Sequence, residues 1–101
     1  MKYKNLINGE WKESNDEIEI HSPADNKLLG TVPAMSKYEV DQAMKSARTA
    51  LKTWKELAPV ERAKYLYKAA DLLEERKEEI GKVVAEEVCK GYKSAISEVV
   101  R

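Results

Sequence analysis

The strongest constraint on the fold is a change of pattern near Met35. Before this residue, turn-forming and β-branched residues dominate, whereas after it glycine and proline become sparse and apolar residues recur every three or four positions. That spacing lines one face of an α-helix, whereas strict alternation lines one face of a strand. The sequence therefore predicts strands in residues 1–35 and helices in residues 36–101.

Two turn signals organise the first part of the chain. Asn8 and Gly9 both tolerate positive φ and lie between apolar stretches, which is typical of a two-residue hairpin turn. Further on, the alternating segment EIEIH and the apolar run LLGTVPA flank the turn formers of SPADNK. We expect a β-hairpin of residues 18–22 and 28–33, with Pro33 ending its second strand.

Capping chemistry predicts where the first helices begin. Ser36 followed by Glu39 is a capping box, in which the hydroxyl accepts from the third helical amide and the carboxylate accepts from the amide of the cap. This pair places the start of a helix at about Lys37. Pro59 predicts the start of the next helix, because a first turn does not need the N–H that proline lacks.

After the two helices that begin at Lys37 and Pro59, the sequence contains a third and a fourth apolar stripe. Gly81 is expected to weaken the helix of the third stripe, which runs from Ile80 to Val88, and Gly91 is expected to adopt the left-handed conformation that often ends a helix. The fourth stripe is short for an independent helix, which needs about 12 to 15 residues, and its apolar face has no obvious partner in the chain. We therefore expect a segment of a longer polypeptide. The fourth stripe comprises Ala95, Ile96, Val99 and Val100.

Composition narrows the class of protein. The 101 residues are 43% hydrophobic, enough for one small domain or part of one, which would bury about 65% of its unfolded surface. Eighteen basic residues balance 18 acidic ones, so we expect neither nucleic acid nor membrane as a partner. No apolar run has the length of a membrane span, and no signal-peptide core follows the first lysines. A cytoplasmic protein is the simplest expectation.

Reactive residues are few. Cys89 is the only cysteine, and we interpret it as a small buried side chain rather than a nucleophile, because neither a base nor a helix amino terminus is expected beside it. His21, the only histidine, falls in the expected hairpin. The sequence contains no GxGxxG, no GxxxxGK[ST] and no metal-ligand spacing. From the residues alone, no reaction can be assigned.

The order of several motifs nevertheless resembles the start of an aldehyde dehydrogenase. INGEW is followed by SPADNKLLGTVPAMS, TWKELAPVERAKYLYKAADLLEERKEEI and EEVCKGYKSA, and the resemblance spans about residues 3–101. VPAMS and EVCKGYKSAISEVVR are similar to the NADP-dependent non-phosphorylating glyceraldehyde-3-phosphate dehydrogenases. Most relatives read closer to Glu-Thr-Gly-Lys-Pro where this chain has Glu87 to Gly91.

The resemblance implies a parent enzyme of glycolysis that oxidises D-glyceraldehyde 3-phosphate to 3-phosphoglycerate while reducing NADP. It implies an α/β fold, assembled as a homo-oligomer, either a dimer or a tetramer. The chain would be the amino-terminal part of the cofactor-binding domain, an incomplete domain with a β-hairpin region (1–35) and a helical region (36–101) of three to four helices. In the family, the catalytic cysteine, glutamate and asparagine and the NADP-binding residues lie beyond Arg101, so the segment alone is expected to be inactive and not to bind NADP.

One substrate-binding residue carries over from the resemblance. Arg101 closes SEVVR and matches an arginine that contacts the substrate phosphate, a role that suits the planar fork of guanidinium donors. A purely structural arginine is the alternative. Two other functions also stay open: another aldehyde dehydrogenase of the superfamily, and a stand-alone helical module that binds a protein partner through its apolar stripes.

Overall fold

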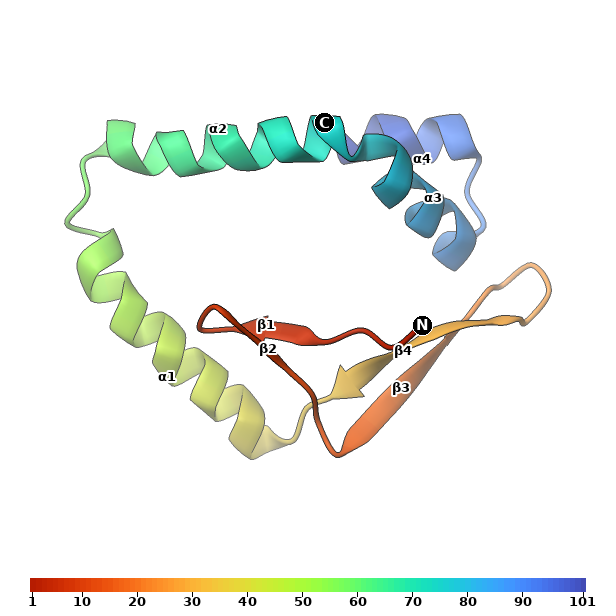
Figure 1. The fold of residues 1–101 in the computed structure, drawn as a ribbon, viewed down its shortest axis with the longest axis horizontal. Coiled ribbons are helices and arrows are strands. Elements are labelled where there is room, and N and C mark those ends of the chain that lie inside the picture. Colours follow the sequence, from red (N-terminus) through yellow and green to blue (C-terminus); the bar gives the residue numbers. More distant parts are fainter. The chain divides into compact units, whose positions relative to one another are not determined.

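The computed structural model describes all residues from Met1 to Arg101, with four strands followed by four helices (Figure 1). This order confirms the expectation from the sequence. Contacts divide the chain into two compact units, residues 1–20 with 30–57 and residues 21–29 with 58–101. The elements are β1 (Asn5–Ile7), β2 (Glu10–Lys12), β3 (Asp16–His21), β4 (Leu28–Ala34), α1 (Lys37–Trp54), α2 (Pro59–Glu75), α3 (Lys77–Val88) and α4 (Tyr92–Val99).

The first hairpin joins β1 and β2 through the predicted Asn8-Gly9 turn. The strands are antiparallel, and Leu6 lies opposite Trp11. Asn8 and Gly9 have φ angles of 52° and 74°, the left-handed region that a tight hairpin turn requires at both central positions. The turn was therefore predictable from two residues.

The second two-stranded sheet pairs β3 with β4. Its turn is closed by a hydrogen bond from the Ser22 amide to the Lys27 carbonyl (2.9 Å), with Asn26 at a φ of 59°. The expected end of the second strand at Pro33 is wrong, because β4 continues through a buried Pro33 to Ala34. Thr31 directs its amide and carbonyl to residues 1–3 rather than to β3. Pro33, two residues further on, lies at the same edge of β4, so its missing N–H removes no hydrogen bond to β3.

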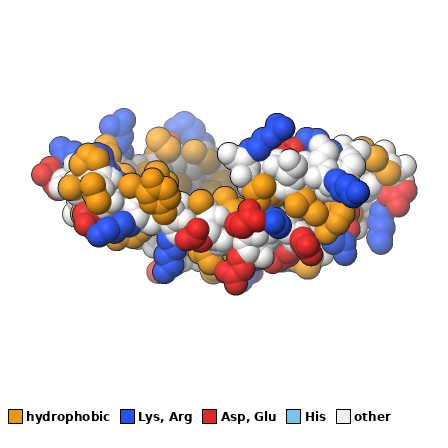
Figure 2. Space-filling model, turned by 90° about the horizontal axis from the view of Figure 1, so that it is seen from above, with side chains coloured by type: hydrophobic (Ala, Val, Ile, Leu, Met, Phe, Trp, Pro, Cys, Tyr) orange, Lys and Arg blue, Asp and Glu red, His pale blue; other side chains and the backbone are white.

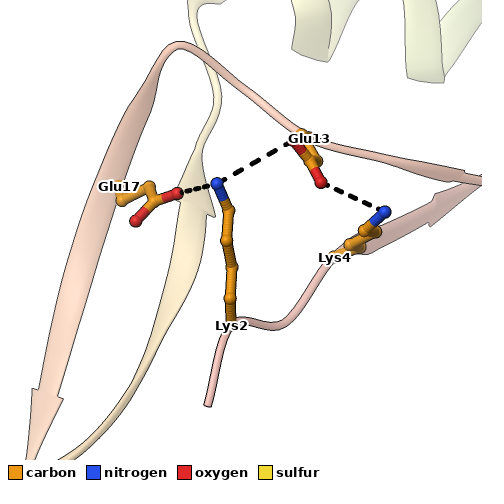
Figure 3. Close-up of polar contacts among 4 residues, drawn as sticks. All are labelled: Lys2, Lys4, Glu13 and Glu17. Carbon is orange, nitrogen blue, oxygen red and sulfur yellow. Dashed lines mark ion pairs between the residues drawn. The ribbon is translucent and has the colours of Figure 1, made fainter.

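The amino-terminal residues extend along β4. The Tyr3 amide donates to the Thr31 carbonyl, and the Thr31 amide donates to the Met1 carbonyl, each at 2.9 Å. Gly30 permits this approach, because a methyl group there would lie 2.4 Å from the Met1 carbonyl oxygen. Figure 3 shows the accompanying ion pairs, which are Lys2 with Glu17 (2.5 Å), Lys2 with Glu13 (3.8 Å) and Lys4 with Glu13 (3.1 Å).

The predicted capping box begins α1. The Ser36 hydroxyl accepts from the Glu39 amide (3.3 Å), and Glu39 Oε2 accepts from the Ser36 amide (2.7 Å). Ser14 adds a contact that the sequence did not predict, since its hydroxyl lies 2.9 Å from the Ala34 carbonyl and 3.0 Å from Glu39 Oε2. A hydroxyl has one proton, so these two acceptors share it. Ser14 thus ties the chain before β3 to the start of α1.

The end of α3 differs from the expectation. Cys89, not Gly91, adopts the left-handed conformation, with a φ of 54°, and its amide donates to the Ala85 carbonyl. Gly91 has a φ of −56° and precedes α4 as its cap. Helix α3 ends at Val88, two residues earlier than a left-handed Gly91 would place its end. The left-handed conformation therefore falls on Cys89, the residue that directly follows the helix.

Helices α3 and α4 pack against each other at a glycine. Gly81 is buried, and a methyl group there would lie 2.7 Å from Cγ1 and 3.0 Å from Cα of Ile96. The adjacent Ala95 is fully buried. Gly81, expected only to weaken a helix, is therefore the point where two helices approach closely.

Most of the apolar surface is uncovered. Apart from the buried glycines and Pro33, Ala95 is the only buried residue, so the hydrophobic core is minimal. The chain exposes 8281 Å², whereas a folded monomer of 11.5 kDa exposes about 5,800 Å². Burial therefore reaches about half of the unfolded surface rather than the expected 65% or so. On the face displayed in Figure 2, hydrophobic side chains lie open among the charged ones.

Candidate functional site

The predicted site residue, Arg101, lines a polar hollow beside α4. The hollow has a volume of about 310 Å³, and its lining contains two cations, one carboxylate and two hydroxyls. We call it the α4 hollow. Its lining residues are Lys90, Ser94, Ser97, Glu98 and Arg101.

Helical periodicity explains how these residues come together. Ser94, Ser97 and Glu98 are spaced by three and four positions, so they lie on one side of α4, whereas Arg101 follows just beyond the end of the helix. Ala95 lies on a different face and is buried. The packing of Ala95 therefore leaves the polar side of the helix toward solvent.

The α4 hollow contains one defined ion pair. Lys90 Nζ donates to Glu98 Oε2 across the turn between α3 and α4. Its hydrogen bond and charge lower the pKa of the Glu98 carboxyl, and the positive charge of Arg101 lowers it further. At neutral pH the hollow thus holds two positive charges and one negative charge. It offers ammonium, guanidinium and hydroxyl donors, a set that suits a phosphate group.

Sequence reasoning named Arg101, whose role as a site residue stays a prediction, and did not name the other four residues that line the α4 hollow. Beside the apolar stripe of α4 runs a complementary polar series at intervals of three and four residues. That series was a usable signal for Ser94, Ser97 and Glu98. Lys90 was harder to predict, because it precedes the helix and its direction depends on the left-handed turn at Cys89.

A second hollow, of about 270 Å³, lies on another side of Arg101. It contains the carboxylates of Asp71 and Glu74 from α2, and these disfavour an anion. Glu74 also forms an ion pair with Lys77. The α4 hollow is therefore the better anion site of the two.

Cys89 is exposed, so its interpretation as a buried side chain is wrong for this structure. It follows the carboxyl end of α3, whereas activated cysteines are often found at helix amino termini. Nδ1 of His21 donates to the Asn26 carbonyl at 3.0 Å, within its own hairpin. These positions do not build a cysteine–histidine nucleophile.

The residues of this chain do not form a dinucleotide site. Such a site uses parallel strands, with a glycine-rich turn leading into a helix whose amino terminus holds the pyrophosphate. Here both sheets have two strands, and β1 and β2 are antiparallel. No step through NADP is therefore assigned to these residues.

Two other features are absent from the fold. No cluster of three histidine, cysteine or acidic side chains has the arrangement of a metal site. No helix has the length and apolar character needed to cross a membrane.

Comparison with known proteins identifies the class. The aldehyde dehydrogenase family matches residues 11–101, and the chain belongs to this family. The resemblance seen in the sequence motifs is thereby confirmed.

Individual relatives give a finer comparison. The chain is 55% identical over 100 residues to the NADP-dependent glyceraldehyde-3-phosphate dehydrogenase of Streptococcus equinus, covering 99% of this chain and 21% of that protein. The crystal structure of the corresponding Bacillus halodurans C-125 enzyme, complexed with NADP, is 48% identical with a TM-score of 0.96, covering 98% of this chain and 21% of that one. The alpha-ketoglutaric semialdehyde dehydrogenase of Bacillus subtilis (strain 168) is 38% identical over 102 residues, with 98% and 21% coverage. The chain thus spans about a fifth of the length of these relatives.

Proposed function

We propose that the chain is the amino-terminal segment of an NADP-dependent dehydrogenase that oxidises D-glyceraldehyde 3-phosphate to 3-phosphoglycerate. One observation carries the proposal, namely the gap in identity between relatives. Over nearly the same residues, identity is 55% to a glyceraldehyde-3-phosphate dehydrogenase but 39% and 38% to malonate-semialdehyde and alpha-ketoglutaric semialdehyde dehydrogenases. A gap of this size favours the phosphorylated substrate.

Within that enzyme, Arg101 is proposed to contact the substrate phosphate. Two properties of the structure support this role: the guanidinium lines the α4 hollow, and the lining also contains a second cation and two hydroxyls beside one carboxylate. A guanidinium and a phosphate form bidentate, charge-assisted hydrogen bonds. Arg101 would therefore contribute to binding rather than to the chemical step.

The test compares substrates in the full-length enzyme. We expect kcat/KM to be highest for glyceraldehyde 3-phosphate with NADP, and lower for malonate semialdehyde, for alpha-ketoglutaric semialdehyde and for NAD as the oxidant. A preference for either semialdehyde would contradict the proposal and favour another activity of the same family.

The isolated 101-residue chain is proposed to be inactive, because none of its residues forms a nucleophile or a dinucleotide site. The measurement is NADPH absorbance with purified chain and glyceraldehyde 3-phosphate. Turnover that increases in proportion to the concentration of the chain would contradict this view.

The full-length enzyme is proposed to be a homo-oligomer, either a dimer or a tetramer. Light scattering coupled to gel filtration measures its oligomeric state directly.

A further inference from the structure

The α4 hollow contains more than the arginine used above. Lys90 and Arg101 approach it from the two ends of α4, and Ser94 and Ser97 lie between them in sequence. A phosphate monoester presents three oxygens that accept hydrogen bonds, and these five groups include four donors. The fifth group, Glu98, accepts only and carries a negative charge.

Glu98 is the residue that this arrangement leaves unexplained. An anion site does not need a carboxylate, because a like charge weakens binding. Yet Glu98 forms an ion pair with Lys90, and Arg101 is close enough to stabilise the same carboxylate. Any anion entering the hollow must therefore compete with Glu98 for Lys90.

We infer that Glu98 is a specificity-determining residue, which occupies Lys90 in the α4 hollow so that a phosphate group displaces it while a carboxylate does not. The inference rests on the proposed function and adds Lys90, Ser94 and Ser97 as phosphate contacts. Its physical basis is charge. A phosphate monoester carries a charge of about −1.5 to −2 at neutral pH, one and a half to two times that of a carboxylate, and offers one more acceptor oxygen.

The competition between Glu98 and a substrate anion for Lys90 also affects which substrates bind. Semialdehydes that carry a carboxylate are the substrates named for several relatives of this chain. With Glu98 in place, such a substrate gains little by replacing one carboxylate with another. The hollow thus discriminates against aldehydes with a carboxylate where aldehydes with a phosphate bind.

The primary experiment titrates inorganic phosphate into the full-length enzyme by calorimetry. The difference between the wild type and Arg101→Ala isolates binding in this hollow. Removing one negative charge a few ångströms from the ligand should tighten binding, so we expect Glu98→Gln to lower the Kd about three- to tenfold. Lys90→Met should raise the Kd by a similar factor.

The matched control is Glu87→Gln, which makes the same charge change at an exposed residue of α3 that does not line the hollow. Its Kd should equal that of the wild type. An equal gain in Glu87→Gln would show a general charge effect and overturn the inference. An unchanged or weaker affinity in Glu98→Gln would also overturn it, leaving Glu98 as a structural partner of Lys90.

A second readout measures selectivity. The ratio of kcat/KM for glyceraldehyde 3-phosphate to that for malonate semialdehyde should fall in Glu98→Gln, because the carboxylate no longer meets a competitor. A constant ratio would contradict the discriminating role.

The failure of the proposed function and the failure of the inference can be told apart. If the enzyme does not oxidise glyceraldehyde 3-phosphate, the proposed function fails, yet the phosphate titration still decides the inference. If Arg101→Ala lowers that oxidation and Glu98→Gln changes neither readout, the proposed function stands and the inference is wrong.

Discussion

Gly81 of α3 lies directly against the backbone of Ile96 in α4. A methyl group at Gly81 would lie 3.0 Å from Ile96 Cα and 3.1 Å from the Ile96 amide nitrogen. Backbone atoms cannot rotate away as a side chain can. The distance between the two helices is therefore limited by the absence of a side chain at Gly81.

Gly81→Ala should destabilise the full-length enzyme. Alanine improves helix propensity by about 0.5–1 kcal/mol, but forcing α3 and α4 apart costs about 1–3 kcal/mol, so the clash should dominate. The measurement is the thermal denaturation midpoint. Gly91→Ala is the matched control, because a methyl group at Gly91 meets no atom within 4 Å and φ is negative. A midpoint as high in Gly81→Ala as in Gly91→Ala would show that the helices can separate at no cost.

Ser36→Ala should destabilise the start of α1. The change removes the hydroxyl that accepts from the Glu39 amide, and loss of a serine cap typically costs about 1 kcal/mol. The measurement is amide hydrogen exchange in the first turn of α1, which should accelerate relative to wild type. Ser46→Ala, in the middle of α1, is the control. Equal exchange in Ser36→Ala and wild type would show that other contacts hold this turn.

The capping box should also depend on pH. Hydrogen bonds from the Ser36 amide, then from the Ser36 and Ser14 hydroxyls, lower the pKa of the Glu39 carboxyl in the folded state. A lowered carboxyl pKa stabilises the fold above the unfolded pKa of about 4.3, and this stabilisation is lost as the pH falls through the folded-state pKa. Glu39→Gln should therefore lower the thermal midpoint at pH 7 and change it less at acid pH. A difference that grows on acidification would contradict this assignment.

If Arg101 binds the substrate phosphate as proposed, Arg101→Ala should affect phosphorylated substrates selectively. Loss of a charge-assisted pair predicts a fall in kcat/KM for glyceraldehyde 3-phosphate of about 10- to 150-fold, whereas unphosphorylated glyceraldehyde should change little. Arg101→Lys should recover only part of the loss, since an ammonium keeps the charge without the fork. Equal losses for both aldehydes would identify Arg101 as a structural residue.

Cys89 should be dispensable for catalysis. Cys89→Ala and Cys89→Gly should both keep kcat within a few fold of wild type, whereas removing a nucleophile costs about 10⁴-fold or more. Cys89→Gly should also be at least as stable as Cys89→Ala, because glycine adopts the observed φ of 54° without strain. Steady-state kinetics and thermal denaturation of the two variants test both statements.

The sequence by itself determined those features that depend on residues close together in the chain. The Asn8-Gly9 turn, the capping box of Ser36 and Glu39, and the start of α2 at Pro59 all appear where the sequence predicts them. Each depends on backbone preferences or hydrogen bonds within about four residues, so the same chemistry acts whatever the rest of the chain does.

The tertiary structure decided which residues far apart in the sequence come into contact. Ser14 meets Glu39 across 25 positions, and Gly81 meets Ile96 only because the chain turns back between α3 and α4. That reversal occurs at Cys89, against the local preference for glycine, and it brings Lys90 to Glu98. Periodicity can place a residue on the face of a helix, but the direction of the next helix depends on packing between elements. For this reason Arg101 could be proposed from its sequence motif, while the hollow around it required the structure.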